Sequence, residues 1–186
     1  MVHRRQQHPG LPRRGGGGPE VFKKRPDEPD DHALGRSRGG FGTKLHLIVD
    51  GHGIPLTVDL TAGQTHDSKR CEPLIQRVLD QWPDVLPMTV AGDKGYSYDR
   101  IRIFLKKHHI DAVIPRRQDQ RTPGDDKDFD RETYRRRCAV ECCIGWLKEC
   151  RAVATRFEKL AVNFLGTLQL ALIRRYLRLL DSSDRA

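Results

Sequence analysis

Two acidic residues stand where a carboxylate can do chemistry, and the first is Asp93. It follows the apolar run VLPMTVA (85–91) within the segment AGDKGYS, so we expect it at the C-terminal end of a buried strand. Open α/β sheets usually bind their ligands at that end of their strands. The glycines at 92 and 95 allow backbone or ligand to approach closely. An equally good interpretation is that Asp93 simply ends a strand in a turn.

The second candidate is Glu141, which lies in the segment YRRRCAVECCIGWLK (134–148). On one helix, at about 100° per residue, a stripe roughly 60° wide contains four polar side chains: Tyr134, Arg137, Glu141 and Lys148. Such a stripe is not typical of a buried face. It suits a helix that presents a metal-binding carboxylate between phosphate-binding cations. The alternative is a solvated charged face, which is common on helices.

The charge balance favours a polyanionic partner. The 186 residues contain 34 lysines and arginines against 25 acidic residues, a net charge of +9. Nucleic acid is the simplest such partner, although a merely soluble basic protein has the same balance. No apolar run approaches the roughly 20 residues of a membrane span, so no membrane partner is expected. The N-terminus lacks the apolar core of a secretion signal, so we expect a cytoplasmic protein with reduced thiols.

The elements that must position these residues alternate between strand and helix. KLHLIVD (44–50) and IPLTVDL (54–60) flank Gly51-His52-Gly53, which predicts a strand hairpin closed by a glycine turn. Apolar residues at helical spacing predict a helix over 67–81, with Thr65 or Asp67 as its N-cap. The further expectations are a strand over 85–91, a helix capped by Ser97 and a strand over 111–115.

Two more helices are expected in the C-terminal part. Asp130 is a plausible cap for a long helix over about 131–150. A final helix over about 160–180 repeats an apolar residue every fourth position, from Leu160 to Leu180, as a core or partner face does. Strands that alternate with helices predict an α/β protein with a mixed sheet flanked by helices.

Taken together, these segments resemble a known family. The spacing Y-x2-R-x3-E-x6-K is the signature of the DDE transposases of bacterial insertion sequences, and the chain matches all four positions. Four other segments match in order and spacing: GRSRGGFGTKLHLIVDGHGIPL (35–56), TAGQTHDS (61–68), AGDKGYS (91–97) and ATRFEKLAVNF (154–164). The resemblance is to the insertion sequence five group and covers nearly all of residues 27–180.

The resemblance implies a ribonuclease H-like fold and a metal-dependent DNA strand cleavage and strand transfer activity. Asp93 would be the second catalytic carboxylate and Glu141 the third. With a first aspartate they would hold two divalent metals, most simply Mg²⁺, for an in-line phosphoryl transfer. Tyr134, Arg137 and Lys148 would position transposon-end DNA. His66 and Asp67 would lie near the metals, although a helix cap explains Asp67 equally well.

One departure from the family concerns the first aspartate. In the family it lies at the end of the first sheet strand, shortly before a stretch that resembles VHRRQQHPG (2–10) here, so it would fall upstream of Met1. Asp50 ends a strand but matches a non-catalytic position. We therefore expect this carboxylate and most of the first strand to be missing. The chain is then either the second frame of a frameshifted gene, fused to an upstream half or acting as an oligomer, or an inactive copy that binds DNA or a full-length partner.

The composition also predicts the domain limits. Residues 1–34 contain a GGGG run, several prolines and basic clusters, and few apolar residues, so they are expected to form a flexible basic arm. The catalytic domain is expected over 35–180, with a short tail over 181–186.

Overall fold

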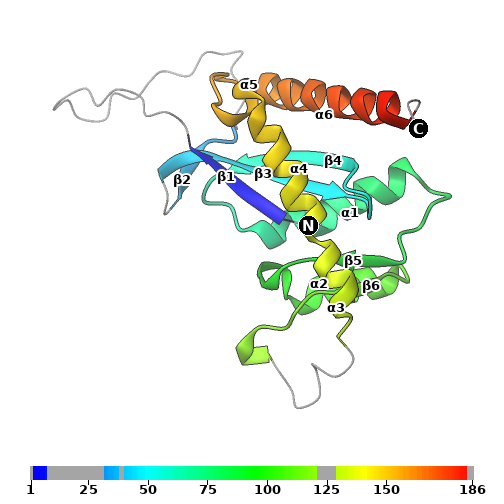
Figure 1. The fold of residues 1–186 in the computed structure, drawn as a ribbon. Coiled ribbons are helices and arrows are strands. Elements are labelled where there is room, and N and C mark those ends of the chain that lie inside the picture. Colours follow the sequence, from blue (N-terminus) through cyan, green and yellow to red (C-terminus); the bar gives the residue numbers. More distant parts are fainter. Residues whose placement is uncertain (1, 8–31, 38–39, 121–128, 184–186) are drawn as a thin grey trace, which may run out of the picture.

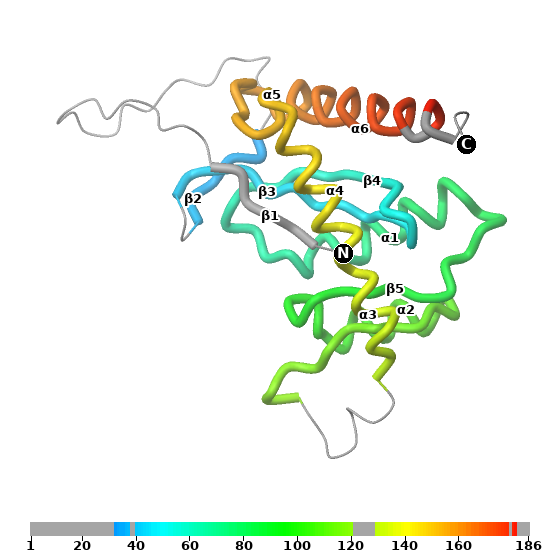
Figure 2. Tube along the Cα trace, viewed as in Figure 1, coloured from blue at the N-terminus to red at the C-terminus, as the bar shows by residue number. Residues whose placement is uncertain are grey.

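A computed structural model describes residues 2–7, 32–37, 40–120 and 129–183. The chain is an α/β protein, as the alternating pattern predicts. Its strands form two small sheets, and helices lie against both of them (Figure 1). The tube trace shows the same arrangement, with the longest helix across one end of the molecule (Figure 2).

The first sheet is built on the predicted hairpin. Strand β3 (Gly40–Val49) pairs antiparallel with β4 (Pro55–Ala62). The turn between them places Gly53 at a φ of +81°, a left-handed conformation that glycine adopts without strain. The carboxylate of Asp50 accepts hydrogen bonds from the amides of His52 and Ile54, at 2.9 and 2.8 Å. Asp50 is therefore a turn-forming residue.

Two further strands join β3. β1 (Val2–Gln7) pairs antiparallel with it from Val2 opposite Leu47 to Gln7 opposite Gly42. β2 (Gly35–Ser37) pairs with its first residues. Residues 2–7 of the arm expected over 1–34 thus lie in a strand, in which pairing satisfies their backbone groups. Ala33 of the same segment is buried. Residues 8–31 of that arm lie outside the described residues.

The second sheet has two strands. β5 (Thr89–Ala91) pairs in parallel with β6 (Asp111–Val113). The predicted strand over 85–91 is too long, because Val85, Leu86 and Met88 are exposed by 66, 61 and 83% and lie outside the sheet. The prediction of one mixed sheet is also incorrect for the described residues, where the antiparallel and parallel strands form separate sheets.

The helix over 67–81 is present as a 3₁₀-helix, η1 (Asp67–Arg70), followed by α1 (Cys71–Gln81). Its cap is neither Thr65 nor Asp67 but His66, whose ring accepts a hydrogen bond from the Ser68 amide. Helix α2 (Asp99–Lys107) begins after Tyr98, without a side-chain cap. The Ser97 hydroxyl bonds the Gln120 side chain in η3 (Gln118–Gln120) instead, so the Ser97 cap was also wrong.

The predicted helix over 131–150 is divided at Arg137 into α3 (Arg131–Arg136) and α4 (Cys138–Glu149). Asp130 caps α3 as expected, accepting from the Thr133 amide at 2.9 Å. Arg137 keeps a helical backbone, with φ −53° and ψ −25°, so α4 continues close to the direction of α3. A short helix, α5 (Arg151–Ala154), leads to the final helix α6 (Ala161–Ser183).

The core has two parts, one on each side of the first sheet. Alternate β3 residues, Leu45 and Leu47, pack with β4, α4 and α6. Ile48 contacts the second cluster, which α1, α2 and β6 build. On α6 the apolar stripe is buried at Phe164, Leu168 and Leu172. It does not continue as predicted to Leu180, which is 63% exposed.

Candidate functional site

Asp93 lies where the sequence places it, directly after β5. Its backbone is extended, and it caps the short 3₁₀-helix η2 (Lys94–Tyr96). Its Oδ1 accepts a hydrogen bond from the Gly95 amide at 2.7 Å. A Cβ at position 95 would lie 2.8 Å from that oxygen, so glycine permits this close turn. The position of Asp93 is therefore compatible with both interpretations. Its Oδ1 forms a turn at the end of the strand, and its Oδ2 is the candidate for binding a ligand.

Glu141 lies in the first turn of α4, and its side chain is about half exposed. Its Oε1 accepts from the guanidinium of Arg137 at 2.8 Å, one helical turn away. The guanidinium carbon of Arg137 lies 5.5 Å from the centre of the Tyr134 ring, within the range of a cation–π contact. The structure thus brings together three of the four residues of the polar stripe.

The electrostatics of Arg137 connect the two carboxylates. Burial acts to lower the pKa of Arg137, but the hydrogen bond and charge of Glu141 raise it above its ordinary value, and Tyr134 and Asp93 contribute in the same direction. Asp93 therefore lies close enough for its charge to act on Arg137. The ion pair with Arg137 neutralises part of the negative charge of Glu141.

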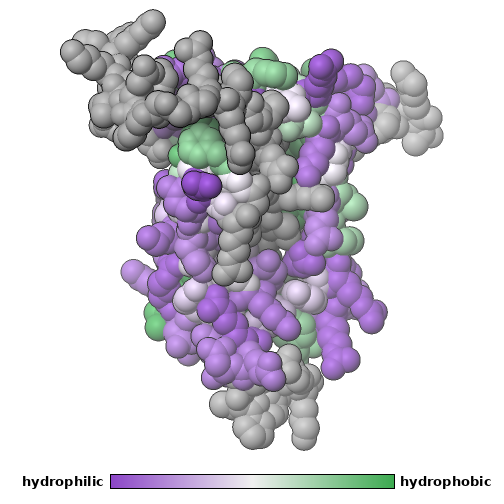
Figure 3. All heavy atoms as spheres, turned by 90° about the vertical axis from the view of Figure 1, so that its left-hand side faces the viewer, coloured by the Kyte–Doolittle hydropathy of each residue, from purple (hydrophilic) through white to green (hydrophobic). Residues whose placement is uncertain are grey.

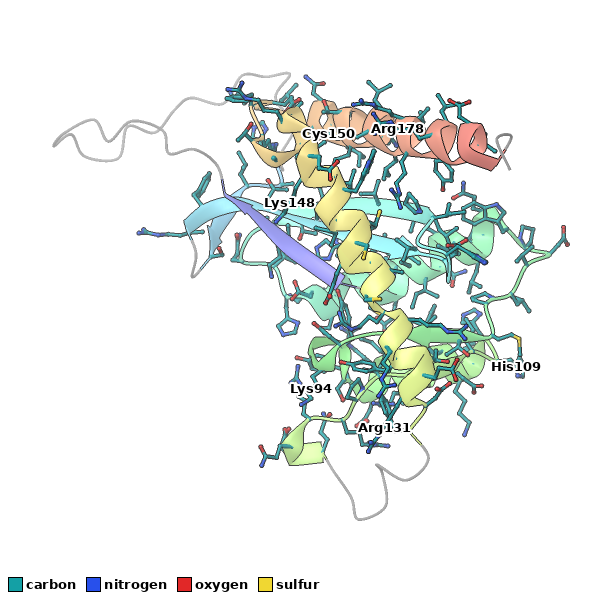
Figure 4. All side chains as sticks on the ribbon, viewed as in Figure 1. Lys94, His109, Arg131, Lys148, Cys150 and Arg178 are labelled. Atoms are coloured by element: carbon teal, nitrogen blue, oxygen red, sulfur yellow. The ribbon has the colours of Figure 1, made fainter. Side chains whose placement is uncertain are left out.

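Lys148 lies apart from this group. It is seven residues beyond Glu141, which corresponds to about 10 Å along α4 at 1.5 Å per residue. Figure 4 shows it in the upper part of α4, well above Lys94, which lies in the lower part of the view. The four-residue stripe is therefore extended along the helix and does not converge on one point. Within the part of the chain that the structure describes, no group of three or more metal-ligating side chains is present.

A polar cluster beside Asp93 was missed by the sequence analysis. The hydroxyl of Tyr98 accepts from the Arg117 guanidinium at 2.9 Å and lies 3.2 Å from Nε2 of His66. The guanidinium carbon of Arg117 is 4.5 Å from the centre of the Tyr98 ring, and its Nε donates to the carbonyl of Lys94. Arg117 is far from Tyr98 in the sequence, in a charged loop without periodicity, so no local pattern identified the pair.

His66 and Asp67, for which two roles were left open, have structural contacts. His66 is the N-cap of η1, as described above. Asp67 forms an ion pair with Lys44 of β3 at 2.8 Å, and both side chains are largely buried. Lys44 also donates to the carbonyl of Thr65. These contacts fix η1 on the first sheet.

A cavity lies between the two sheets, and Arg137 is one of the residues that line it. Its volume is about 620 Å³. Its walls come from the end of β3 with the hairpin turn, from α1 and the loop after it, from β5, and from α3 and α4. Arg136 and Arg137 line it on the side of the helices. The cavity therefore opens beside the residues that the polar stripe brings together.

Comparison with known proteins identifies the family. The sequence profile of the transposase DDE domain matches residues 20–174, well over half of the chain. The chain belongs to this family of transposases. The family generally uses divalent metal ions.

Two relatives are similar to most of the chain. A protein of Burkholderia cepacia described as a transposase for insertion sequence element IS402 is 32% identical over 125 residues, which is 64% of this chain and 56% of that protein. The chain thus spans little more than half of that relative. A protein of Brucella ovis described as a transposase for insertion sequence element IS6501 is 31% identical over 140 residues, 73% of this chain and 98% of that protein. No solved structure matches the chain.

None of the helices in the described ranges is both long enough and apolar enough to cross a bilayer.

Proposed function

We propose that the chain is part of the DNA-cutting and strand-transferring site of a bacterial insertion-sequence transposase of the insertion sequence five group. Asp93 and Glu141 are two of its metal ligands. The observation that supports the proposal is the ion pair of Arg137 with Glu141, together with the contribution of the Asp93 charge to the raised pKa of Arg137. Asp93 after β5 and Glu141 on α4, which are 48 positions apart in the sequence (141 − 93), thus both favour the charged form of one guanidinium.

The donor set fits a hard divalent cation in part. Carboxylate oxygens are the ligands that Mg²⁺ prefers. Oδ1 of Asp93 accepts a hydrogen bond from the Gly95 amide, and Oε1 of Glu141 pairs with Arg137. The other oxygen of each carboxylate, Oδ2 or Oε2, is therefore the candidate metal ligand. Two carboxylates are one short of the three that a two-metal site in this family needs, so we propose that a third comes from outside residues 1–186. Metals bound in the complete site would activate the attacking oxygen and stabilise the leaving oxygen.

The basic side chains of this region are proposed to bind the substrate, double-stranded DNA at the transposon ends and target. Arg137 can give up its ion pair with Glu141 when Glu141 binds a metal, and it can then bind a phosphate. A guanidinium pairs with a carboxylate or with a phosphate through two parallel hydrogen bonds. Tyr134 orients Arg137 through its ring. Lys148, further along α4, would contact a phosphate at some distance from the reacting bond. Apart from the atoms drawn in grey, the face shown in Figure 3 is mostly hydrophilic.

The fold proposed for the complete protein is ribonuclease H-like. In that fold one mixed sheet would unite the two sheets seen here, and the carboxylates would lie at its centre. Because of its DNA substrate, we propose that the protein acts in the bacterial cytoplasm, at the nucleoid.

A second function is favoured by the net charge of +9, which suits a polyanionic partner without requiring any chemistry. A chain of this composition can still bind DNA or a full-length transposase without cutting, and so act as a non-catalytic fragment.

An end-cleavage assay tests the first function. The chain of residues 1–186 is expected not to cut transposon-end DNA with Mg²⁺ or Mn²⁺. A version extended upstream by a strand that contains the family's first aspartate is expected to cut, and Asp93→Asn or Glu141→Gln should abolish cutting in that version. Robust cutting by residues 1–186 that Asp93→Asn abolishes would place the first carboxylate within the chain, and Asp50 would be the next residue to substitute.

A further inference from the structure

The polar cluster around Tyr98 lies outside the polar stripe of α3 and α4. It joins three segments of the chain: His66 before η1, Tyr98 between η2 and α2, and Arg117 before η3. The Nε of Arg117 donates to the carbonyl of Lys94, the residue after Asp93, at 3.3 Å. The cluster therefore adjoins the turn that carries Asp93, although the chemistry proposed above does not use it.

Arg117 carries a positive charge that no carboxylate neutralises in the described part of the chain. It is half-buried, and its hydrogen bonds go to neutral acceptors, the carbonyl of Lys94 and the hydroxyl of Tyr98. Arg100 differs, because it lies 5.6 Å from the centre of the same Tyr98 ring but forms an ion pair with Glu72. A half-buried cation without a counter-ion favours the binding of an anion from another molecule.

The hydroxyl of Tyr98 accepts hydrogen bonds from both of its partners. The Ser68 amide donates to Nδ1 of His66 at 3.3 Å, so the neutral ring carries its proton on Nε2. Nε2 lies 3.2 Å from the Tyr98 oxygen and therefore donates to it. Arg117 donates to the same oxygen at 2.9 Å. Since both partners are donors, the proton of the Tyr98 hydroxyl is available to an acceptor outside the cluster.

These groups define the chemistry of the ligand. The Tyr98 hydroxyl and the remaining N–H groups of Arg117 are donors, and Lys94, whose side chain is exposed, adds a second cation. Donors of this kind select a group that is negatively charged and only accepts hydrogen bonds. The non-bridging oxygens of a phosphodiester meet both conditions, and a guanidinium binds them through two parallel hydrogen bonds.

We infer that Tyr98 and Arg117 form a binding site for one backbone phosphate of DNA, and that His66 is a positioning residue that keeps the Tyr98 hydroxyl turned toward this phosphate. Lys94 adds its charge at the edge of the site. The inference rests on the proposed function and deepens it, because it names a contact that would hold a DNA strand beside Asp93. Phosphate contacts carry no base information, so the site should bind DNA of any sequence.

Salt-dependent binding of the full chain to a mixed-sequence duplex of about 20 base pairs, without metal, tests the charge of the site. Arg117→Gln should reduce the slope of log K against log salt by roughly one unit, whereas Arg117→Lys should retain it. Arg100→Gln is the matched control and should leave the slope unchanged, because Glu72 already pairs with Arg100. If Arg117→Gln fails to fold, the exposed Lys94→Gln takes its place, with the same expected loss.

The hydroxyl is tested separately. Tyr98→Phe keeps the ring and the charges but removes one donor, so the affinity for the duplex should fall about threefold to tenfold while the slope stays the same. The ring signals of His66 in the nuclear magnetic resonance spectrum, identified by their loss in His66→Gln, should shift when the duplex is added. They should not shift in Arg117→Gln. A merely structural role of the cluster would produce neither effect.

Unchanged slopes in both Arg117→Gln and Lys94→Gln, or an unchanged affinity in Tyr98→Phe, would overturn the inference. Inorganic phosphate supplies the same oxygens without DNA, and a shift of the His66 signals with inorganic phosphate but not with the duplex would also overturn it, because the site would then bind a free anion. None of these measurements uses a metal or DNA cleavage. Failure of the phosphate site and failure of the proposed catalytic function are therefore distinguishable.

Discussion

Arg137 and Glu141 form an ion pair of 2.8 Å across one turn of helix at the junction of α3 and α4. The Arg137 side chain is mostly buried and that of Glu141 is about half exposed, so the pair is only partly screened by solvent. The arginine holds a carboxylate proposed to bind a metal. It must exchange that contact for another when the metal binds.

Removal of Arg137 should therefore have opposite effects on metal and on DNA. In Arg137→Ala the affinity of the chain for Mn²⁺ should rise a few-fold, because a competing cation is lost, while its affinity for DNA should fall. Titration calorimetry with Mn²⁺ and a DNA-binding assay measure the two effects. Arg136→Ala is the matched control, since Arg136 pairs with Glu132 instead. A fall in both affinities would assign Arg137 to the folded scaffold.

The salt dependence of DNA binding should identify the phosphate contacts. If Arg137 and Lys148 each bind a phosphate, replacement of either by alanine should reduce the slope of log K against log salt by about one unit. Binding isotherms at several salt concentrations give the slope. An unchanged slope in the Lys148→Ala protein would remove that residue from the DNA surface.

Arg156 should be essential for folding, although it is charged. Only 1% of its surface is exposed, and it donates to the carbonyls of His32, Glu158 and Lys159 and to the Thr43 hydroxyl. Arg156→Ala should lower the free energy of unfolding by roughly 3–5 kcal/mol, because it leaves a cavity and orphaned acceptors. Denaturant unfolding measures this. The exposed Arg151→Ala should change it by less than about 0.5 kcal/mol, and an equally small effect at Arg156 would contradict the prediction.

Four of the five cysteines should divide into two groups by their reactivity. Burial raises the pKa of Cys71 to about 12 and also raises the pKa of Cys143, so at pH 8 both stay protonated and inaccessible. Cys138 and Cys142 are exposed. A thiol reagent at pH 8 should modify these two first and reach Cys71 only after denaturation, as mass spectrometry of the digested protein can show. Early modification of Cys71 would mean that its helix opens readily.

The local elements were largely predictable, because each depends on a short pattern. The hairpin over 44–60 follows from the period-two alternation on both sides of the glycine turn. Gly53 in that turn has a positive φ, which glycine adopts without strain. The cap at Asp130 follows from one side chain that reaches an amide three residues away. The Ser97 cap is absent because the Ser97 hydroxyl bonds the distant Gln120 side chain, and the Thr65 cap is absent because the neighbouring His66 caps η1 instead.

The sequence by itself determined the family, the α/β class, and Asp93 and Glu141 as candidates, since motif order and local periodicity are written along the chain. Only the tertiary structure decided that Arg137 pairs with Glu141, that Lys148 lies apart from that pair, and that Arg117 stacks on Tyr98. It also showed that residues 2–7 pair with β3 and that a cavity separates the sheets. Strand pairing and cavity walls depend on backbone edges from distant segments, and no local pattern of side chains specifies which edges meet.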